Sequence, residues 1–341
     1  MTIISLSDFY AVQSLPEGCI AALGFFDGVH RGHRAIIDSA VKTAAENNSS
    51  PAVWMISRGG EAFKGNAPLL LPEEEKLKLL KEAGVSYAVL SRFEDIRSMS
   101  GYDFVKSILK DTLRLSGVVC GFNFRFGKGA AFGEADLESF AKELGMTCSI
   151  VPPVTIGNAP VSSSRIRALI ADGKLEKAEE LLGRPYYIDL PVIRGKMLGR
   201  VLGFPTINQL IPNSSALPAR GVYAVSVTLP DGNVFPGAAN VGVCPTVTDD
   251  ILAEADIDYS NTPGAAKKDH PVCETYICGF SGDLYGKKVK ISFLQQIRGE
   301  VKFDSVDALS QRIRLDAKTA EDIFNSKTLN YNKNERSADL S

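Results

Sequence analysis

Two of the chain's three histidines lie together in one short segment, Gly24 to His33, among several glycines. His30 and His33 are three residues apart, so on a helix both rings leave the same face. A helix N-terminus offers N–H groups to an anion, and glycines let a phosphate approach the main chain. The segment therefore predicts a phosphate cradle in which two imidazoles stabilise charge on phosphorus. The competing interpretation is a helix cap with incidental histidines, which the glycines on both sides disfavour.

A second cluster, from Val161 to Arg167, combines hydroxyl and guanidinium groups at the start of a predicted helix. Its polar members are Ser162, Ser163, Ser164, Arg165 and Arg167. Such groups suit the outer phosphates of a nucleotide, although serine caps are common. A third cluster, Gly121 to Gly127, places Asn123 among aromatic residues that could hold a flat ring or simply close a turn.

The C-terminal half contains a basic, glycine-rich run from Gly195 to Asn208. In an extended segment Thr206 and Asn208 project from the same face. Two such side chains can offer oxygen ligands to a magnesium ion that nucleotide phosphates already hold, while glycines let the loop close over the phosphates. The members expected to bind the nucleotide are Gly195, Lys196, Gly199, Arg200, Thr206 and Asn208. No GK[ST] helix start is present, so this is not a Walker loop, and an ordinary structural loop is the alternative.

Glu274 stands in a predicted strand whose alternation places its carboxylate on an otherwise apolar face, with Val272, Tyr276 and Cys278. If that face points into a closed barrel, burial would raise the proton affinity of the carboxylate. It would then be a plausible base for a primary alcohol. The alternative is a glutamate at a strand edge in water.

Strands that alternate with helices would position the N-terminal groups. We expect strands at Cys19 to Phe26, Ala52 to Ile56, Tyr87 to Leu90, Gly117 to Cys120 and Thr147 to Val151. We expect helices after His30 and at Glu73 to Ala83, Asp103 to Leu113, Glu134 to Leu144, Ser164 to Asp172 and Leu175 to Leu182. This alternation predicts an α/β, Rossmann-like domain with a parallel sheet and helices on both faces.

Beyond Gly183-Arg184-Pro185 the pattern changes, so we place a domain boundary there. Period-two runs follow at Gly221 to Leu229, Val234 to Val241, Val272 to Phe280 and Lys288 to Leu294. They predict an antiparallel sheet, closed or nearly closed, covered by an amphipathic helix that carries Val306 and Phe324. The domains are then 1–183 and 184–329, followed by a polar, frayed tail at 330–341.

The bulk composition fits two soluble globular domains in 341 residues. The chain has 38 basic and 40 acidic residues, and its net charge of -2 does not point to a nucleic acid or a membrane surface as partner. The N-terminus lacks the pattern of a signal peptide and no run is apolar enough to span a membrane, so we expect a cytoplasmic protein. The six cysteines form no C-x-x-C pair, which favours reduced thiols over a zinc site.

The three N-terminal clusters, in this order, resemble the flavin adenylyltransferase module of bacterial bifunctional riboflavin kinase/FAD synthetases, which belongs to the H-x-G-H nucleotidyltransferase superfamily. The resemblance implies transfer of AMP from ATP to FMN with release of pyrophosphate, with magnesium as helper ion. It implies catalytic roles for His30, His33 and Asn123. It also implies ATP contacts from Gly24, Phe25, Asp27, Gly28, His30, His33, Ser162, Ser163, Ser164, Arg165 and Arg167.

The C-terminal motifs are similar to the complete series of the riboflavin kinase domain. They are Gly199 to Asn208, Gly221 to Tyr223, Ala239 to Gly242 with Pro245-Thr246, Glu274-Thr275, Asp283 to Gly286 and Arg298 to Phe303. The resemblance implies a six-stranded Greek-key barrel in which Thr206 and Asn208 bind Mg-ATP and Glu274 deprotonates the ribityl 5'-hydroxyl. Tyr276 and Arg298 join Glu274 as expected flavin contacts.

The sequence departs from the family after the second predicted strand. It has Ile56 to Glu61 where a Phe-x-Pro-His-Pro-like segment is usual, and Gly129 to Glu134 also differs. The first hypothesis is therefore a two-step enzyme that converts riboflavin to FMN and FMN to FAD. The second is a riboflavin kinase with a weakened or repurposed adenylyltransferase domain, and the third is a regulator that binds flavin or nucleotide without turnover. Riboflavin, FMN and ATP are the expected partners of a monomer or weak homo-oligomer, and 250–269 is expected to be an exposed loop.

Overall fold

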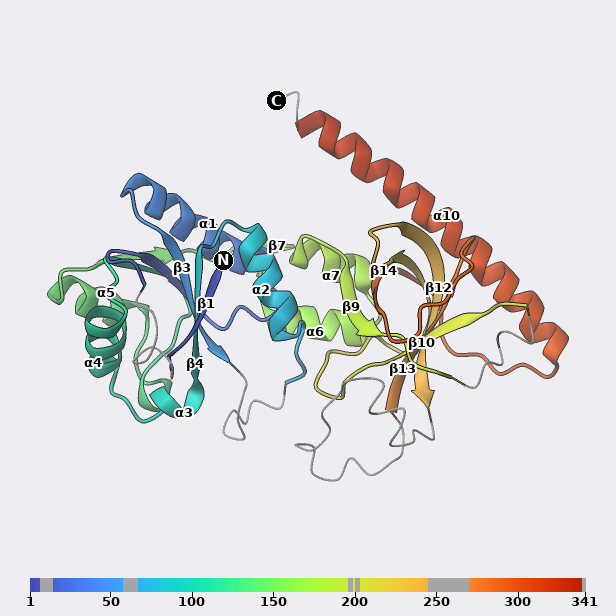
Figure 1. Cartoon of the computed structure of the whole chain (residues 1–341), viewed down its shortest axis with the longest axis horizontal. Coiled ribbons are helices and arrows are strands. Elements are labelled where there is room, and N and C mark those ends of the chain that lie inside the picture. Colours follow the sequence, from blue (N-terminus) through green and yellow to red (C-terminus); the bar gives the residue numbers. More distant parts are fainter. Residues whose placement is uncertain (7–14, 58–66, 196–198, 200–202, 245–269, 339–341) are drawn as a thin grey trace. The chain divides into compact units, whose positions relative to one another are not determined.

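The computed structural model describes residues 1–6, 15–57, 67–195, 199, 203–244 and 270–338, with side chains up to 329 (Figure 1). The chain folds into two compact units, Met1–Ser163 and Ser164–Ser341. Two predicted nucleotide ligands, Lys196 and Arg200, and the expected loop at 250–269 lie outside the described residues.

The first unit is built on a six-stranded sheet in which every pair of neighbouring strands is parallel. In sheet order the strands are β1 (Thr2–Ser5), β4 (Tyr87–Arg92), β3 (Pro51–Ser57), β2 (Ile20–Leu23), β5 (Gly117–Gly121) and β6 (Thr147–Val151). The central strands β2 and β5 are buried along their whole length, as expected of a sheet covered on both faces. A two-stranded hairpin, β7 (Thr155–Ile156) and β8 (Ala159–Pro160), follows β6.

Helices cover both faces of this sheet, and each face has its own apolar core (Figure 1). On one face Ala21 and Leu23 of β2 pack with the π-helix η2 (Phe104–Thr112) and with α5 (Glu134–Glu143). On the other face Ile20 and Ala22 pack with α1 (Arg31–Glu46) and α2 (Glu73–Glu82). Alternate residues of one strand therefore serve opposite cores, which confirms the predicted α/β fold. The short helices of this unit are α3 (Phe93–Ile96), α4 (Gly101–Asp103) and η3 (Lys128–Ala130).

The second unit contains a six-stranded antiparallel sheet. In sheet order the strands are β10 (Thr206–Leu210), β13 (His270–Ile277), β12 (Val234–Cys244), β11 (Gly221–Thr228), β14 (Lys288–Arg298) and β9 (Tyr186–Pro191). The two outer strands approach each other where Ile193, just after β9, donates its N–H to the carbonyl of Asn208 at 2.8 Å. This contact curves the sheet into the nearly closed barrel that the sequence predicts.

The C-terminal helix α10 (Val306–Ala338) runs across the barrel strands and continues past them (Figure 1). Its Ala320 packs with Ala224 of β11, Ala238 of β12 and Leu294 of β14, and small residues on both sides allow this close approach. The helix extends through most of the segment predicted as a frayed tail, so that part of the prediction is wrong for the backbone up to Ala338. The two compact units divide between Ser163 and Ser164, so α6 (Ser163–Ala171) and α7 (Leu175–Leu182) group with the second unit. The domain boundary at 183/184 stays a prediction.

Among the described helices, none combines the length and apolarity that crossing a membrane requires. The cysteines recorded in the described part of the chain are free thiols, and Cys19, Cys120, Cys273 and Cys278 are buried.

Candidate active sites

His30 and His33 form a stacked pair at the start of α1. Their ring centroids lie 3.6 Å apart with planes inclined by 15°. His30 is the N-cap of the helix, and its Nδ1 accepts the backbone N–H of His33 at 3.2 Å. Both rings therefore leave the same face of the first turn, as the spacing predicts. The capping interpretation also holds for His30, because one of its ring nitrogens is used to start the helix.

His33 is held in its neutral form by its surroundings. Burial, followed by the nearby positive groups of His30 and Lys76, lowers the pKa of His33 well below the usual 6.5. Its ring meets that of Phe26 edge-on at 5.4 Å, and its buried Nδ1 has no hydrogen-bond partner among the described residues. A neutral imidazole can donate a hydrogen bond to a phosphate oxygen without carrying a full charge.

The loop before α1 has a strained backbone that the rest of the unit holds in place. Phe26 and Gly28 adopt left-handed φ angles of 51° and 84°. A Cβ on Gly28 would lie 2.6 Å from Cδ1 of Leu70, so glycine is required there. The buried carboxylate of Asp27 accepts the N–H of Leu70 at 3.0 Å, and the hydroxyl of Ser163 donates to the carbonyl of Asp27 at 2.9 Å. Asp27 therefore shapes the loop through both its side chain and its backbone.

A cavity of about 460 Å³ opens beside this loop. Gly24, Phe25, His33 and Asn123, all predicted from the sequence, contribute to its wall. Ile56, the start of the segment that departs from the family pattern, also lines it, together with residues that the sequence did not single out: Trp54, Phe93, Ile96, Arg97 and Phe104. Aromatic walls with arginines at the edge suit a flat, anionic ligand.

Several other predicted ligands lie away from that wall. Asp27, Gly28, His30 and Ser162 do not line the cavity, while Ser163 reaches the loop through Asp27. Ser164, Arg165 and Arg167 follow in α6 within the second unit. The unusual segment, Ile56 to Glu61, begins within the last two residues of β3, and its residues 58–61 lie outside the described part of the chain.

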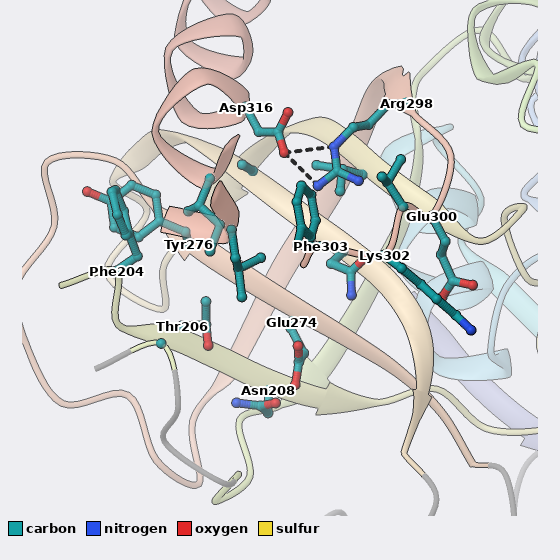
Figure 2. A pocket seen from close by; sticks show the side chains of 17 residues that line it. Phe204, Thr206, Asn208, Glu274, Tyr276, Arg298, Glu300, Lys302, Phe303 and Asp316 are labelled. Atoms are coloured by element: carbon teal, nitrogen blue, oxygen red, sulfur yellow. Dashed lines mark hydrogen bonds and ion pairs between the residues drawn. The ribbon is translucent and has the colours of Figure 1, made fainter. Parts of the chain in front are cut away.

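In the second unit, strand register brings the predicted kinase residues together. Asn208 of β10 lies directly opposite Glu274 of β13, and Thr206 lies opposite Tyr276. Paired residues on neighbouring strands point to the same face, so these four side chains share one surface. Asn240 of β12 flanks Glu274 on its other side. Figure 2 shows Thr206, Asn208 and Glu274 gathered on one side of a cavity of about 710 Å³.

Glu274 is exposed rather than buried inside a closed barrel, and it stands between β10 and β12 rather than at a sheet edge, so neither alternative from the sequence holds in full. The strand alternation is as predicted, but the face opens into the cavity between the sheet and α10, whose Leu309 and Ile313 form part of the wall. Tyr276 is half-buried there with its ring edge-on to Phe204 at 5.3 Å, and burial raises its pKa.

Arg298, the third predicted flavin contact, is fixed by a carboxylate that the sequence did not reveal. Asp316 of α10 is 3% exposed and accepts Nε and Nη2 of Arg298 at 2.9 and 2.8 Å (Figure 2). Its second oxygen accepts Nε of Arg312 at 2.9 Å. The guanidinium of Arg298 also lies 5.6 Å from the ring centre of Phe303. The buried Asp316 thus joins α10 to β14 through Arg298, and Arg298 in turn contacts Phe303 in the segment between them.

Two glycines allow the chain to approach the paired polar residues closely. A Cβ on Gly195 would lie 2.6 Å from the amide nitrogen of Asn208, and one on Gly199 would lie 3.3 Å from the hydroxyl of Thr206. Any larger residue would displace these side chains. Two described members of the predicted glycine-rich run, Gly195 and Gly199, therefore lie against Asn208 and Thr206.

The fold and the two sites define a two-domain transferase of phosphorus-containing groups. A family model described as FAD synthetase matches residues 12–165, and one described as riboflavin kinase matches residues 182–324. The bifunctional riboflavin kinase/FMN adenylyltransferase of Haemophilus influenzae is 33% identical over 314 residues, covering 91% of this chain and 96% of the relative. The enzyme of the same description from Escherichia coli K12 is 32% identical and covers 92% and 95%. The chain belongs to the bifunctional riboflavin kinase/FMN adenylyltransferase family.

A solved structure agrees with this fold. A crystal structure described as a macrolide-efflux protein from Streptococcus pneumoniae superposes with a TM-score of 0.79 and 26% sequence identity. It covers 94% of this chain and 99% of its own chain, so both units are represented in it.

Proposed function

We propose that the second unit phosphorylates riboflavin to FMN. The observation that carries this proposal is the register pairing of Glu274 with Asn208, next to Thr206, on the wall of a cavity large enough for a flavin. Glu274 takes the proton of the ribityl 5'-hydroxyl as its oxygen attacks the terminal phosphorus of ATP, and ADP leaves. Tyr276 and Arg298 hold the flavin, so that the reaction depends mainly on positioning.

Magnesium suits the oxygen donors of this site. Among the described residues, no group of three or more His, Cys, Asp or Glu side chains could hold a metal ion by itself. The hydroxyl of Thr206 and the amide oxygen of Asn208 are neutral ligands, which fit an ion that arrives with the phosphates of ATP. When bound, Mg²⁺ neutralises phosphate charge. The chain's own contribution is to orient the two oxygens, with Gly195 and Gly199 closing over them.

We further propose that the first unit transfers AMP from ATP to FMN. The stacked His30 and His33 at the N-terminus of α1 support this role, because His33 lines the cavity, His30 stacks on it, and the N-terminus of the helix carries a partial positive charge. A phosphate oxygen of FMN attacks the α-phosphorus of ATP, and pyrophosphate leaves. His33 donates a hydrogen bond to the developing charge, and Asn123 orients the reacting groups. Aromatic walls at Trp54 and Phe104 receive the isoalloxazine ring.

Further ATP contacts are proposed from the backbone of the loop before α1 and from a second cluster at the start of α6. Gly24, Phe25 and Gly28 approach the nucleotide through the backbone, and the serine and arginine cluster that begins α6 binds the outer phosphates. Its proposed members are Ser162, Ser163, Ser164, Arg165 and Arg167. Lys196 and Arg200 are proposed for the ATP of the kinase site. A cytoplasmic location and a monomer or weak homo-oligomer complete the proposal.

The second candidate is a riboflavin kinase with weak adenylyl transfer, which the departure from the family pattern at Ser57 to Glu61 favours. One experiment separates the two. The purified chain is incubated with Mg-ATP and either riboflavin or FMN, and the flavins are resolved by chromatography. FAD formed from FMN supports the two-step enzyme. FMN accumulating without FAD refutes it in favour of the second candidate, and the absence of any product would leave a binding protein.

A further inference from the structure

The first unit contains a buried lysine next to its phosphate loop. Lys76 belongs to α2 and is 3% exposed. Its Nζ donates to the carbonyl oxygen of Phe25 at 3.1 Å and lies 4.4 Å from the centre of the Phe25 ring. Phe25 itself lines the 460 Å³ cavity, one residue after Gly24. A lysine that is 51 residues away in sequence is thus fixed to the loop that precedes α1.

A buried ammonium group costs free energy unless something in its surroundings compensates for it. Two other lysines of the same helix lie in water, since Lys78 is half-exposed and pairs with Glu75, and Lys81 is exposed. The loop also has no lysine of the kind that GK[ST] loops direct at phosphates. A fixed cation behind the loop would fill that role for a bound polyphosphate.

The electrostatics of His33 connect Lys76 to the phosphate site independently of its contact with Phe25. The positive groups that act on His33 are His30, from the start of α1, and Lys76, from α2. Both lower the pKa of His33, in addition to its burial. The charge of Lys76 therefore reaches the imidazole that lines the cavity.

We propose that Lys76 is a positioning residue of the adenylyl-transfer site, which fixes Phe25 and supplies a positive charge behind the triphosphate of ATP. This inference rests on the proposed transfer of AMP in the first unit. It predicts that Lys76 contributes to ATP affinity at this site without touching the flavin. It also predicts that the charge of Lys76 contributes to the lowered pKa of His33, which an uncharged structural contact would not do.

The test follows ATP binding at the ring resonance of His33 by NMR, which separates this site from the ATP site of the second unit. The chain has three histidines, so His33 can be assigned by single substitutions. Lys76→Met keeps the length of the side chain and removes its charge. We expect it to weaken ATP binding about tenfold or more, as for loss of a charged hydrogen bond, and to raise the pKa of His33. Lys76→Arg should restore both to within about threefold.

Lys81→Met is the matched control, because Lys81 lies on the same helix and is exposed. It should leave the ATP affinity and the titration of His33 unchanged. The dispersion of the NMR spectrum, including the His30 and His33 ring resonances, reports that the first unit of each variant is folded. If Lys76→Met fails to fold, Lys76→Gln provides the same neutral comparison.

Equal ATP affinity and equal His33 titration in Lys76→Met and Lys81→Met would overturn the inference. So would the absence of any effect of ATP on His33 in the wild-type chain. Failure of the wild-type chain to make FAD from FMN would instead refute the proposed transfer. The binding comparison needs no turnover and would still measure the role of Lys76.

Discussion

Replacing Asp316 by asparagine should loosen the junction between the barrel and α10. The carboxylate is 3% exposed and accepts three hydrogen bonds, two from Arg298 and one from Arg312. Removing one partner of a buried ion pair costs about 3–5 kcal/mol. The side chains of Arg298 and Arg312 are 15% and 39% exposed, so water partly compensates them, and asparagine retains one acceptor oxygen. We therefore expect the free energy of unfolding to fall by about 2 kcal/mol.

Scanning calorimetry of the full chain would measure this loss, and hydrogen exchange in β14 and α10 would locate it. The expected loss lowers the transition of the second unit by about 4–8 °C. The KM for riboflavin should rise because Arg298 is no longer held beside the cavity. Asp322→Asn, at an exposed position of the same helix, is the control and should change stability by less than about 0.5 kcal/mol. Equal stability and equal KM in the two variants would refute the reasoning.

Three further predictions concern single residues of the two sites. Glu274→Gln should abolish FMN formation from riboflavin and spare FAD formation from supplied FMN; chromatography showing loss of both would contradict separate sites. Gly28→Ala should destabilise the first unit in urea by about 2 kcal/mol or more, because it combines φ of 84° with a clash on Leu70. Gly129→Ala, with φ of 66° and nothing within 4 Å, should cost only about 1 kcal/mol. The pKa of His33 in the folded chain lies below 6.5, so below about pH 6.5 the unfolded chain binds a proton that the folded chain does not. The contribution of His33 to the free energy of unfolding is therefore complete above about pH 6.5 and is lost as the pH falls. Urea titrations at several pH values should therefore show a smaller pH dependence for His33→Gln, and an equal dependence would contradict the assigned shift.

Local patterns in the sequence predicted most of the fold. The apolar runs of β2, β3 and β5 mark strands buried on both faces, and the spacing of His30 and His33 lies within one helical turn, so no tertiary information was needed. The strand β1 and the hairpin of β7 and β8 were missed because each has four residues or fewer, too short for a period to show.

Contacts between distant segments could not be predicted in the same way. Lys76 looks like its neighbours Lys78 and Lys81 in sequence, and only the packing of α2 beside the loop distinguishes it. Asp316 was likewise one of several charged residues in an amphipathic helix. The exposure of Glu274 could not be decided from the sequence, because alternation fixes which face a side chain is on but not what covers that face.

The most direct test of two separate sites on one chain is a mixing experiment. The Glu274→Gln and His33→Gln variants are each incubated with riboflavin and Mg-ATP, alone and together, and FAD is measured. Each variant alone should give no FAD, the first because it makes no FMN and the second because it cannot adenylate FMN. The mixture should form FAD, since FMN released by one chain can be used by the other. A mixture that stays without FAD while FMN accumulates would contradict the account.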